Sequence, residues 1–117
     1  MRRVDGVERA LGVLRMRYVA RVALDELAAV AGMSKFHFLR RFRAMTGLTP
    51  GQYQRRLRIE AAKQALRAGE SPGQVALAFG FVDQSHFTRT FRTSTGLTPA
   101  RFARSTGGAT DPAAGVD

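Results

Sequence analysis

The chain has 117 residues, no cysteine and a formal net charge of +10 at pH 7. This length suits one domain with its own core, and the lack of cysteine excludes a disulfide framework, a thiol nucleophile and a cysteine-ligated metal site. Of the 19 basic residues only Lys35 and Lys63 are lysines, and arginine suits bidentate contacts with phosphate and guanine. The charge favours a polyanion as partner, although a charged stretch is more often a solvated face.

Features typical of membrane proteins and enzymes are missing from the sequence. No apolar run could span a membrane, and the N-terminus lacks the apolar segment of a secretory signal. No paired carboxylates, phosphate loop or nucleophile with a base indicate an enzyme, and no ligand cluster accompanies His37 or His86. We therefore expect no catalysis, no metal, no cofactor and no membrane partner, and a cytoplasmic, nucleoid-associated protein.

The first two predicted helices are amphipathic. A helix over Asp5–Ala20 has four apolar residues on one face: Val7, Leu11, Leu14 and Tyr18. This face favours packing of the helix into the core; the alternative is binding to a membrane surface. Leu24–Ala31 forms a second, short helix that ends at Gly32. Its start is weak because Ala23 is a poor N-cap.

The third predicted helix, Ser34–Thr46, begins at a good N-cap, Ser34. Its inward stripe is predicted to consist of Phe38, Phe42 and Met45. The outward face comprises Lys35, Phe36, Leu39, Arg40 and Arg43. Apolar residues on an exposed face need a packing partner or a ligand.

Four further helices are predicted after this one. Pro50–Ala68 starts with a capping box and would be about 28 Å long. A second box at Ser71 begins a short helix through Phe79, and Asp83 caps a helix over Asp83–Thr95. A last short helix begins at Thr98–Pro99 and runs to about Arg104. No strand pattern competes, so the predicted fold is all α with seven helices.

A motif of helix, glycine turn and helix occurs twice in the chain. The recurring residues are 49 positions apart: Phe38, Phe42, Gly47, Leu48, Thr49 and Pro50 match Phe87, Phe91, Gly96, Leu97, Thr98 and Pro99. Such a repeat predicts two helix-turn-helix subdomains. We expect the first over residues 5–49, a linker helix over 50–68, the second over 69–104, and a disordered tail over 105–117.

The sequence resembles that of AraC/XylS-type transcriptional regulators. The resemblance lies in the two motifs, in the intervening LRIEAAKQAL and in the final AFGFVDQSHFTRTFRTSTGLTPARF. The resemblance covers about Arg9 to Arg104 and implies that Ser34–Thr46 and Asp83–Thr95 are recognition helices. Most members also carry an N-terminal sensing domain, which is expected to be absent here, as in short stand-alone members. The resemblance extends to adaptive-response methyltransferases, but these need a reactive cysteine.

The resemblance also implies which residues face the bases, and the cations, hydroxyls and His86 beside them are candidates for phosphate contacts. The predicted base-contacting residues are Phe36, Leu39, Arg40, Gln84, Ser85, Thr88 and Arg89. The predicted phosphate contacts are Lys35, Arg41, Arg43, Thr49, Arg55, His86, Arg92 and Thr98. Arg40 and Arg89 suit guanine, Gln84 suits adenine, and apolar side chains suit thymine methyl groups.

These observations predict a sequence-specific, double-stranded DNA-binding transcription regulator that inserts two recognition helices into successive major grooves. Because the two faces differ in sequence, we expect a monomer on an asymmetric site, with RNA polymerase as a candidate second partner. The alternative is a sequence-neutral nucleoid-type or RNA-binding basic protein, which needs the charge but not two distinct recognition faces.

Overall fold

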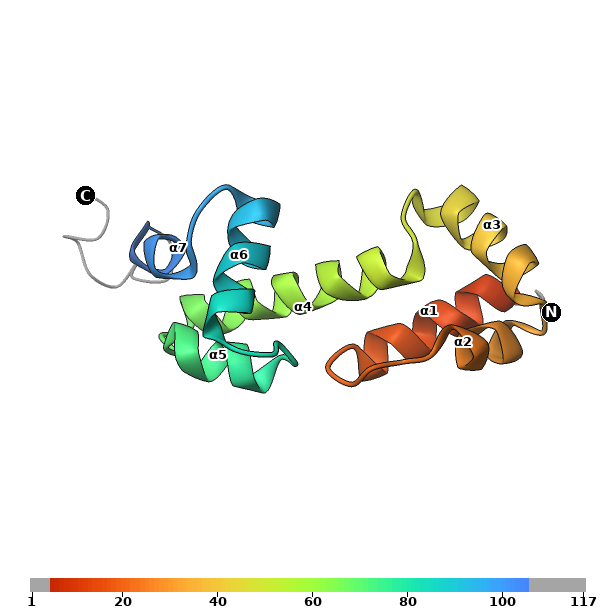
Figure 1. Cartoon of the computed structure of the whole chain (residues 1–117), viewed down its shortest axis with the longest axis horizontal. Coiled ribbons are helices and arrows are strands. Elements are labelled where there is room, and N and C mark those ends of the chain that lie inside the picture. The colour runs from red at the N-terminus through yellow and green to blue at the C-terminus, as the bar shows by residue number, and fades with distance from the viewer. Residues whose placement is uncertain (1–4, 106–117) are drawn as a thin grey trace. The chain divides into compact units, whose positions relative to one another are not determined.

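The computed structural model describes residues 5–105, and this part of the chain contains seven α-helices and no strand. Figure 1 follows them in chain order: α1 (Gly6–Arg17), α2 (Leu24–Ala31), α3 (Lys35–Thr46), α4 (Pro50–Arg67), α5 (Pro72–Ala78), α6 (Gln84–Thr95) and α7 (Pro99–Ser105). The predicted all-α fold is confirmed. Residues 106–117 of the predicted tail lie outside the described residues, whereas Ser105, predicted as the first residue of that tail, is the last residue of α7.

The helix starts follow the local capping signals. The side chains of Asp5, Ser34 and Asp83 accept backbone N–H groups of the first turns of α1, α3 and α6. Because an N-cap residue has extended backbone dihedrals, each of these helices begins one residue later than predicted. Ser71 and Gln74 form the predicted capping box of α5, whereas Ala23 makes no side-chain cap at α2.

The first helix is shorter than predicted, because it ends at Arg17 instead of Ala20. The side-chain amide of Gln54 donates hydrogen bonds to the carbonyl oxygens of Tyr18, at 3.1 Å, and Ala20, at 2.5 Å. These carbonyls are thereby satisfied by a distant side chain and need no further helical turn. Gln54 itself is only 9% exposed, so this contact fixes the end of α1 against α4 within the first part of the chain.

The chain divides between Leu57 and Arg58 into two compact units, and the boundary falls inside α4. In the first unit, α1 packs on α2 and α3, and the core contains Val7, Leu11, Leu14, Leu27, Phe38 and Phe42. In the second unit, α6 packs on α5 and α7, and the core contains Ile59, Leu66, Val75, Phe87, Phe91 and Phe102. Each unit therefore has a hydrophobic core of its own.

The second half of α4 packs into the core of the second unit as α1 packs into the core of the first. Three buried residues of α1 are spaced by three and four positions: Val7, Ala10 and Leu14. Three buried residues of α4 have the same spacing: Ile59, Ala62 and Leu66. The internal repeat thus includes a packing helix before each helix-turn-helix, and α4 is a core element of the second unit as well as a connection.

One predicted core residue is wrong. Met45 was expected on the inward stripe of α3, but its side chain is 44% exposed. It lies in the last turn of the helix, one turn beyond Phe42, and the matching residue of α6, Ser94, is exposed too. The last turn of each of these two helices therefore extends past the core that covers the phenylalanines.

Candidate nucleic-acid interface

The turn between α2 and α3 is held by backbone and core contacts. Gly32 ends α2 with φ of 71°, a left-handed conformation that favours glycine, and the N–H of Met33 donates to the carbonyl of Ala28 at 3.0 Å. On α3, Phe38 and Phe42 are fully buried, with ring centroids 5.5 Å apart. With these two rings inward, the opposite face of α3 is presented to solvent.

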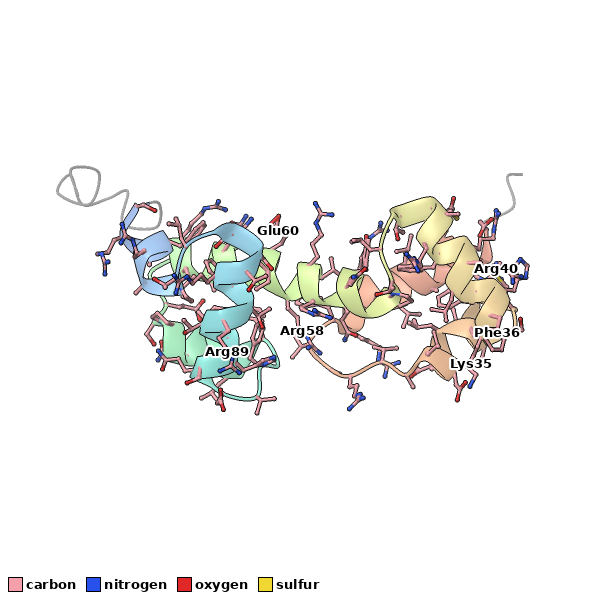
Figure 2. The ribbon with its side chains drawn as sticks, turned by 45° about the horizontal axis from the view of Figure 1, so that its top comes forward. Lys35, Phe36, Arg40, Arg58, Glu60 and Arg89 are labelled. Carbon is pink, nitrogen blue, oxygen red and sulfur yellow. The ribbon has the colours of Figure 1, made fainter. Side chains whose placement is uncertain are left out.

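Two of the predicted base-contacting residues, Phe36 and Arg40, are exposed on this face of α3. Figure 2 shows Lys35, Phe36 and Arg40 on α3, and Phe36 is 77% exposed. Leu39, predicted on the same outward face, is half-buried and lines a surface hollow of about 480 Å³ together with Leu24, Leu27 and Pro50. The side chain of Leu39 is thus partly exposed on the outward face and partly covered beside residues of α2 and α4.

The cations of α3 differ in their partners. Lys35 forms an exposed ion pair with Asp25 at 3.2 Å, and Arg41 forms an ion pair and a hydrogen bond with Asp5. The guanidinium groups of Arg40 and Arg43 have no carboxylate partner within residues 5–105 and are exposed. Arg40 and Arg43 are therefore available to an external anion without loss of an internal contact.

The matching helix α6 offers a more polar surface. Gln84, Ser85, Arg89 and Arg92 are exposed, and Thr88 is half-buried like Leu39, its counterpart 49 residues earlier. Figure 2 labels Arg89 on this helix. The fully buried Phe87 and Phe91 hold the helix in the same way as the phenylalanines of α3. The two helices thus present equivalent positions with different side-chain chemistry.

His86 is partly occupied by contacts within its own unit. Its Nδ1 accepts the backbone N–H of Val82 at 3.4 Å, and its ring lies 5.6 Å from that of Phe81. These contacts orient the ring and leave Nε2 for a ligand. In the described part of the chain, no group of three or more histidine, cysteine or carboxylate residues is placed to hold a metal ion.

The threonines predicted to contact phosphate start the helices that follow α3 and α6. Thr49 Oγ1 accepts the N–H of Gln52 at 3.2 Å, and Thr98 Oγ1 accepts the N–H of Arg101 at 3.3 Å. Each hydroxyl keeps its proton for donation to an external acceptor. Arg55, further along α4, is exposed. All three side chains can therefore donate to an anion.

Two structural threonines were missed by sequence reasoning. Thr46 Oγ1 donates to the carbonyl of Phe42 at 2.8 Å and accepts the N–H of Leu48 at 3.1 Å. Thr95 makes the equivalent contacts to Phe91 and Leu97 at 2.8 and 3.2 Å. Their spacing of 49 residues is the same as that of the other repeated residues, so the repeat itself contained the signal. These contacts fix the turn that positions Thr49 and Thr98.

In residues 5–105, no helix combines the length and the apolar character needed to cross a lipid bilayer. The exposed surface around α3 and the start of α4 is instead rich in arginine. Between Ser34 and Arg58 the chain has seven basic residues and no acidic one. Helix N-termini with exposed cations beside them are suited to phosphate groups.

Comparisons with known proteins agree with this geometry. A family model described as a helix-turn-helix domain matches residues 27–105. An uncharacterized HTH-type transcriptional regulator of Bacillus subtilis, YbfI, is 38% identical over 81 residues, which are 69% of this chain and 30% of that protein. The chain therefore spans less than a third of the length of this relative.

Two solved structures share the fold along most of the chain. The AraC-type transcriptional regulator of Chromobacterium violaceum matches with a TM-score of 0.79 and 27% identity, over 86% of this chain and 90% of that one. The DNA-binding domain of AdpA, solved in complex with a target DNA, matches with a TM-score of 0.81 and 28% identity, over 93% and 98%. The chain belongs to the helix-turn-helix domain family, within its AraC type, whose members are DNA-binding domains of transcriptional regulators.

Proposed function

We propose that this chain binds double-stranded DNA sequence-specifically and regulates transcription, by inserting α3 and α6 into successive major grooves. The observation that carries this proposal is the repeated helix of the two units, with two fully buried phenylalanines inward and exposed cations or amides outward. The N-terminal residues of a recognition helix reach base edges in the major groove. The similar AdpA domain, solved with its target DNA, supports binding to double-stranded DNA.

The base contacts follow from side-chain chemistry at the outward positions. Arg40 and Arg89 each donate two hydrogen bonds to guanine, and Gln84 pairs with adenine. Phe36 contributes an apolar contact and Ser85 a hydroxyl. Leu39 and Thr88 are half-buried, so only their exposed edges meet the bases.

The phosphate contacts are proposed to surround these positions. They comprise Lys35, Arg41, Arg43, Thr49, Arg55, His86, Arg92 and Thr98. The ion pair of Lys35 with Asp25 has side chains that are 55% and 77% exposed, and such solvated pairs contribute little to stability. Lys35 can therefore exchange Asp25 for a phosphate. Arg41 is bound to Asp5 and is the weaker candidate of the set.

The site is proposed to be asymmetric and read by a monomer. The outward residues of α3 and α6 differ at most equivalent positions, so two identical half-sites would not suit both. Helix α4 has 18 residues and is about 27 Å long, comparable with the groove repeat of about 34 Å in B-DNA. RNA polymerase is the expected second partner of such a regulator, and the nucleoid in the cytoplasm its expected location.

Binding measurements with three variants test this proposal. We expect Arg40→Ala and Arg89→Ala to cost about 1–3 kcal/mol on a selected duplex and to relax the preference at one base pair each. Arg104→Ala, which removes an exposed arginine of α7 with no assigned role, provides a control of equal charge. Equal affinity of the unchanged protein for selected and random duplex, at physiological salt, would instead favour sequence-neutral binding.

A further inference from the structure

We infer that Gly73 of α5 is a positioning residue for the second motif, and that it acts through Gln84, the first residue of α6. The inference rests on the proposed function, in which Gln84 pairs with adenine, and it adds a determinant of specificity that lies outside α6. Because Gly73 has no side chain, it leaves the space in which the amide of Gln84 lies. This space sets the direction in which the amide is presented to a base.

The side-chain amide of Gln84 lies against the start of α5. A Cβ atom added to Gly73 would be 3.2 Å from the amide oxygen of Gln84 and 4.0 Å from its amide carbon. The oxygen belongs to the group that pairs with adenine, in which it accepts from the amino group of the base while the nitrogen donates to N7. A methyl group at residue 73 would therefore displace the acceptor of this pair.

The backbone of α5 does not require glycine at this position. Gly73 is the second residue of the helix and is not among the glycines with a positive φ. Glycine is also less favourable than alanine in a helix. Within residues 5–105, Gln84 is the only residue outside α5 that an added Cβ atom would meet within 4 Å. The feature that glycine provides here is thus the space for the side chain of Gln84.

The first unit joins the same two positions by an ion pair. Asp25 is the second residue of α2 and Lys35 the first residue of α3, and they correspond to Gly73 and Gln84 at offsets of 48 and 49 residues. The carboxylate oxygen of Asp25 lies 3.2 Å from the ammonium nitrogen of Lys35. The approach of these two positions is therefore a property of the fold that both units share.

The two units use this approach differently. In the first unit the carboxylate of Asp25 binds the side chain of Lys35. In the second unit Gly73 offers no group that could bind the amide of Gln84. Within residues 5–105 this amide has no hydrogen-bond partner, so it keeps its donor and its acceptor for a base. Gly73 thus confines the amide without competing for its hydrogen bonds.

The Gly73→Ala variant tests the inference on a duplex selected with the full chain. Gln84→Ala first identifies the base pair that Gln84 contacts, as the one at which the preference for adenine is lost. At this base pair we expect Gly73→Ala to lower the preference about threefold, the share of one hydrogen bond in a bidentate contact. The preferences at the other base pairs are expected to stay unchanged.

Gly51→Ala is the matched control. Gly51 is the second residue of α4, and it follows a proline in a capping box as Gly73 does, but a Cβ atom at Gly51 meets nothing within 4 Å. Since alanine is favourable in a helix, both variants are expected to keep or raise the melting temperature. Only Gly73→Ala should change the preference at the base pair that Gln84 contacts.

The double variant of Gly73→Ala and Gln84→Ala shows whether Gly73 acts through Gln84. Its preferences should equal those of Gln84→Ala alone, because the contact is already removed. The inference is wrong if Gly73→Ala keeps the full preference for adenine, if Gly51→Ala lowers it equally, if the double variant differs from Gln84→Ala, or if Gln84→Ala alters no preference. Sequence-specific binding stands in each of these cases. A protein that binds selected and random duplex equally overturns the proposed function and this inference together.

Discussion

Arg41 of α3 donates a hydrogen bond to the carboxylate of Asp5, the residue that caps the first helix. The two residues are 36 positions apart, and their contact joins the start of α1 to the middle of α3. The hydrogen bond from Arg41 and a second one from the N–H of Val7 hold the pKa of Asp5 below its ordinary value of 3.8. In the second unit the residue equivalent to Arg41 is Thr90, so this contact belongs to the first unit alone.

The Asp5–Arg41 pair predicts a pH-dependent contribution to stability. A carboxyl group whose pKa is lowered on folding stabilises the fold above its unfolded pKa and loses this effect as the pH falls through the folded value. Asp5→Asn keeps a good N-cap and removes the charge. We expect the variant to melt below the unchanged protein at pH 6, and the difference to shrink once the pH falls below about 3.8.

Thermal melts of both proteins between pH 6 and pH 2.5 measure this difference. Arg41→Ala should show the same loss of the difference at low pH, since it removes the other partner of the pair. A gap in melting temperature that stays constant over this range would contradict the role given to the ion pair.

Two glycines of α1 are predicted to respond oppositely to alanine. A Cβ atom at Gly6 would lie 2.2 Å from the carbonyl oxygen of Ala31, so the backbones of α1 and α2 would have to separate. Such overpacking costs about 1–3 kcal/mol. At Gly12 the same atom meets nothing within 4 Å, and alanine in a helix interior gains about 0.5–1 kcal/mol over glycine.

Urea unfolding of Gly6→Ala and Gly12→Ala, each compared with the unchanged protein, tests this pair. The first should lower the free energy of unfolding and the second should raise it. Equal effects of the two substitutions would show that α1 does not approach α2 as closely as the structure has it.

Arg55 is predicted to affect all DNA sequences alike. Its exposed guanidinium on α4 is assigned to a phosphate, which carries no sequence information. Arg55→Ala should weaken binding to selected and random duplex by the same factor and reduce the slope of log affinity against log salt by about 1. A salt titration on both duplexes measures this effect. A loss of affinity for the selected duplex alone would contradict the phosphate contact and indicate that Arg55 contacts a base.

Gln54 is predicted to fix the end of α1. Gln54→Ala removes the donor of two hydrogen bonds, to the carbonyls of Tyr18 and Ala20, and a typical intramolecular hydrogen bond contributes about 0.5–1.5 kcal/mol. Gln52→Ala, which removes an exposed member of the Thr49 capping box, should cost less. Unfolding curves that rank the two variants in the opposite order would contradict the contact.

The local features of this fold could be read from the sequence because each depends on a few neighbouring residues. The caps at Ser34, Ser71 and Asp83 require only a side chain and an N–H three positions on. The inward stripes of Phe38 and Phe42, and of their repeats, follow from helical periodicity. The repeat itself predicted that both helices expose equivalent positions.

Contacts between distant residues could not be predicted in this way. Arg9 of α1 donates to the carbonyls of Val30 and Ala31 at the end of α2, at 3.2 and 3.3 Å, and no pattern in the sequence joins these segments. The same is true of Arg41 with Asp5. For this reason Arg41 was predicted as a phosphate contact of the same rank as Arg43, although only Arg43 lacks a carboxylate partner in the described part of the chain. That role stays a prediction for both.

Selection from random double-stranded DNA with the full chain tests the central claim most directly. We predict enrichment of one asymmetric motif, with two unlike half-sites centred about one helical turn apart, bound by a monomer. A guanine is expected in each half-site. Recovery of no motif, or of a two-fold palindrome bound only by dimers, would contradict the account.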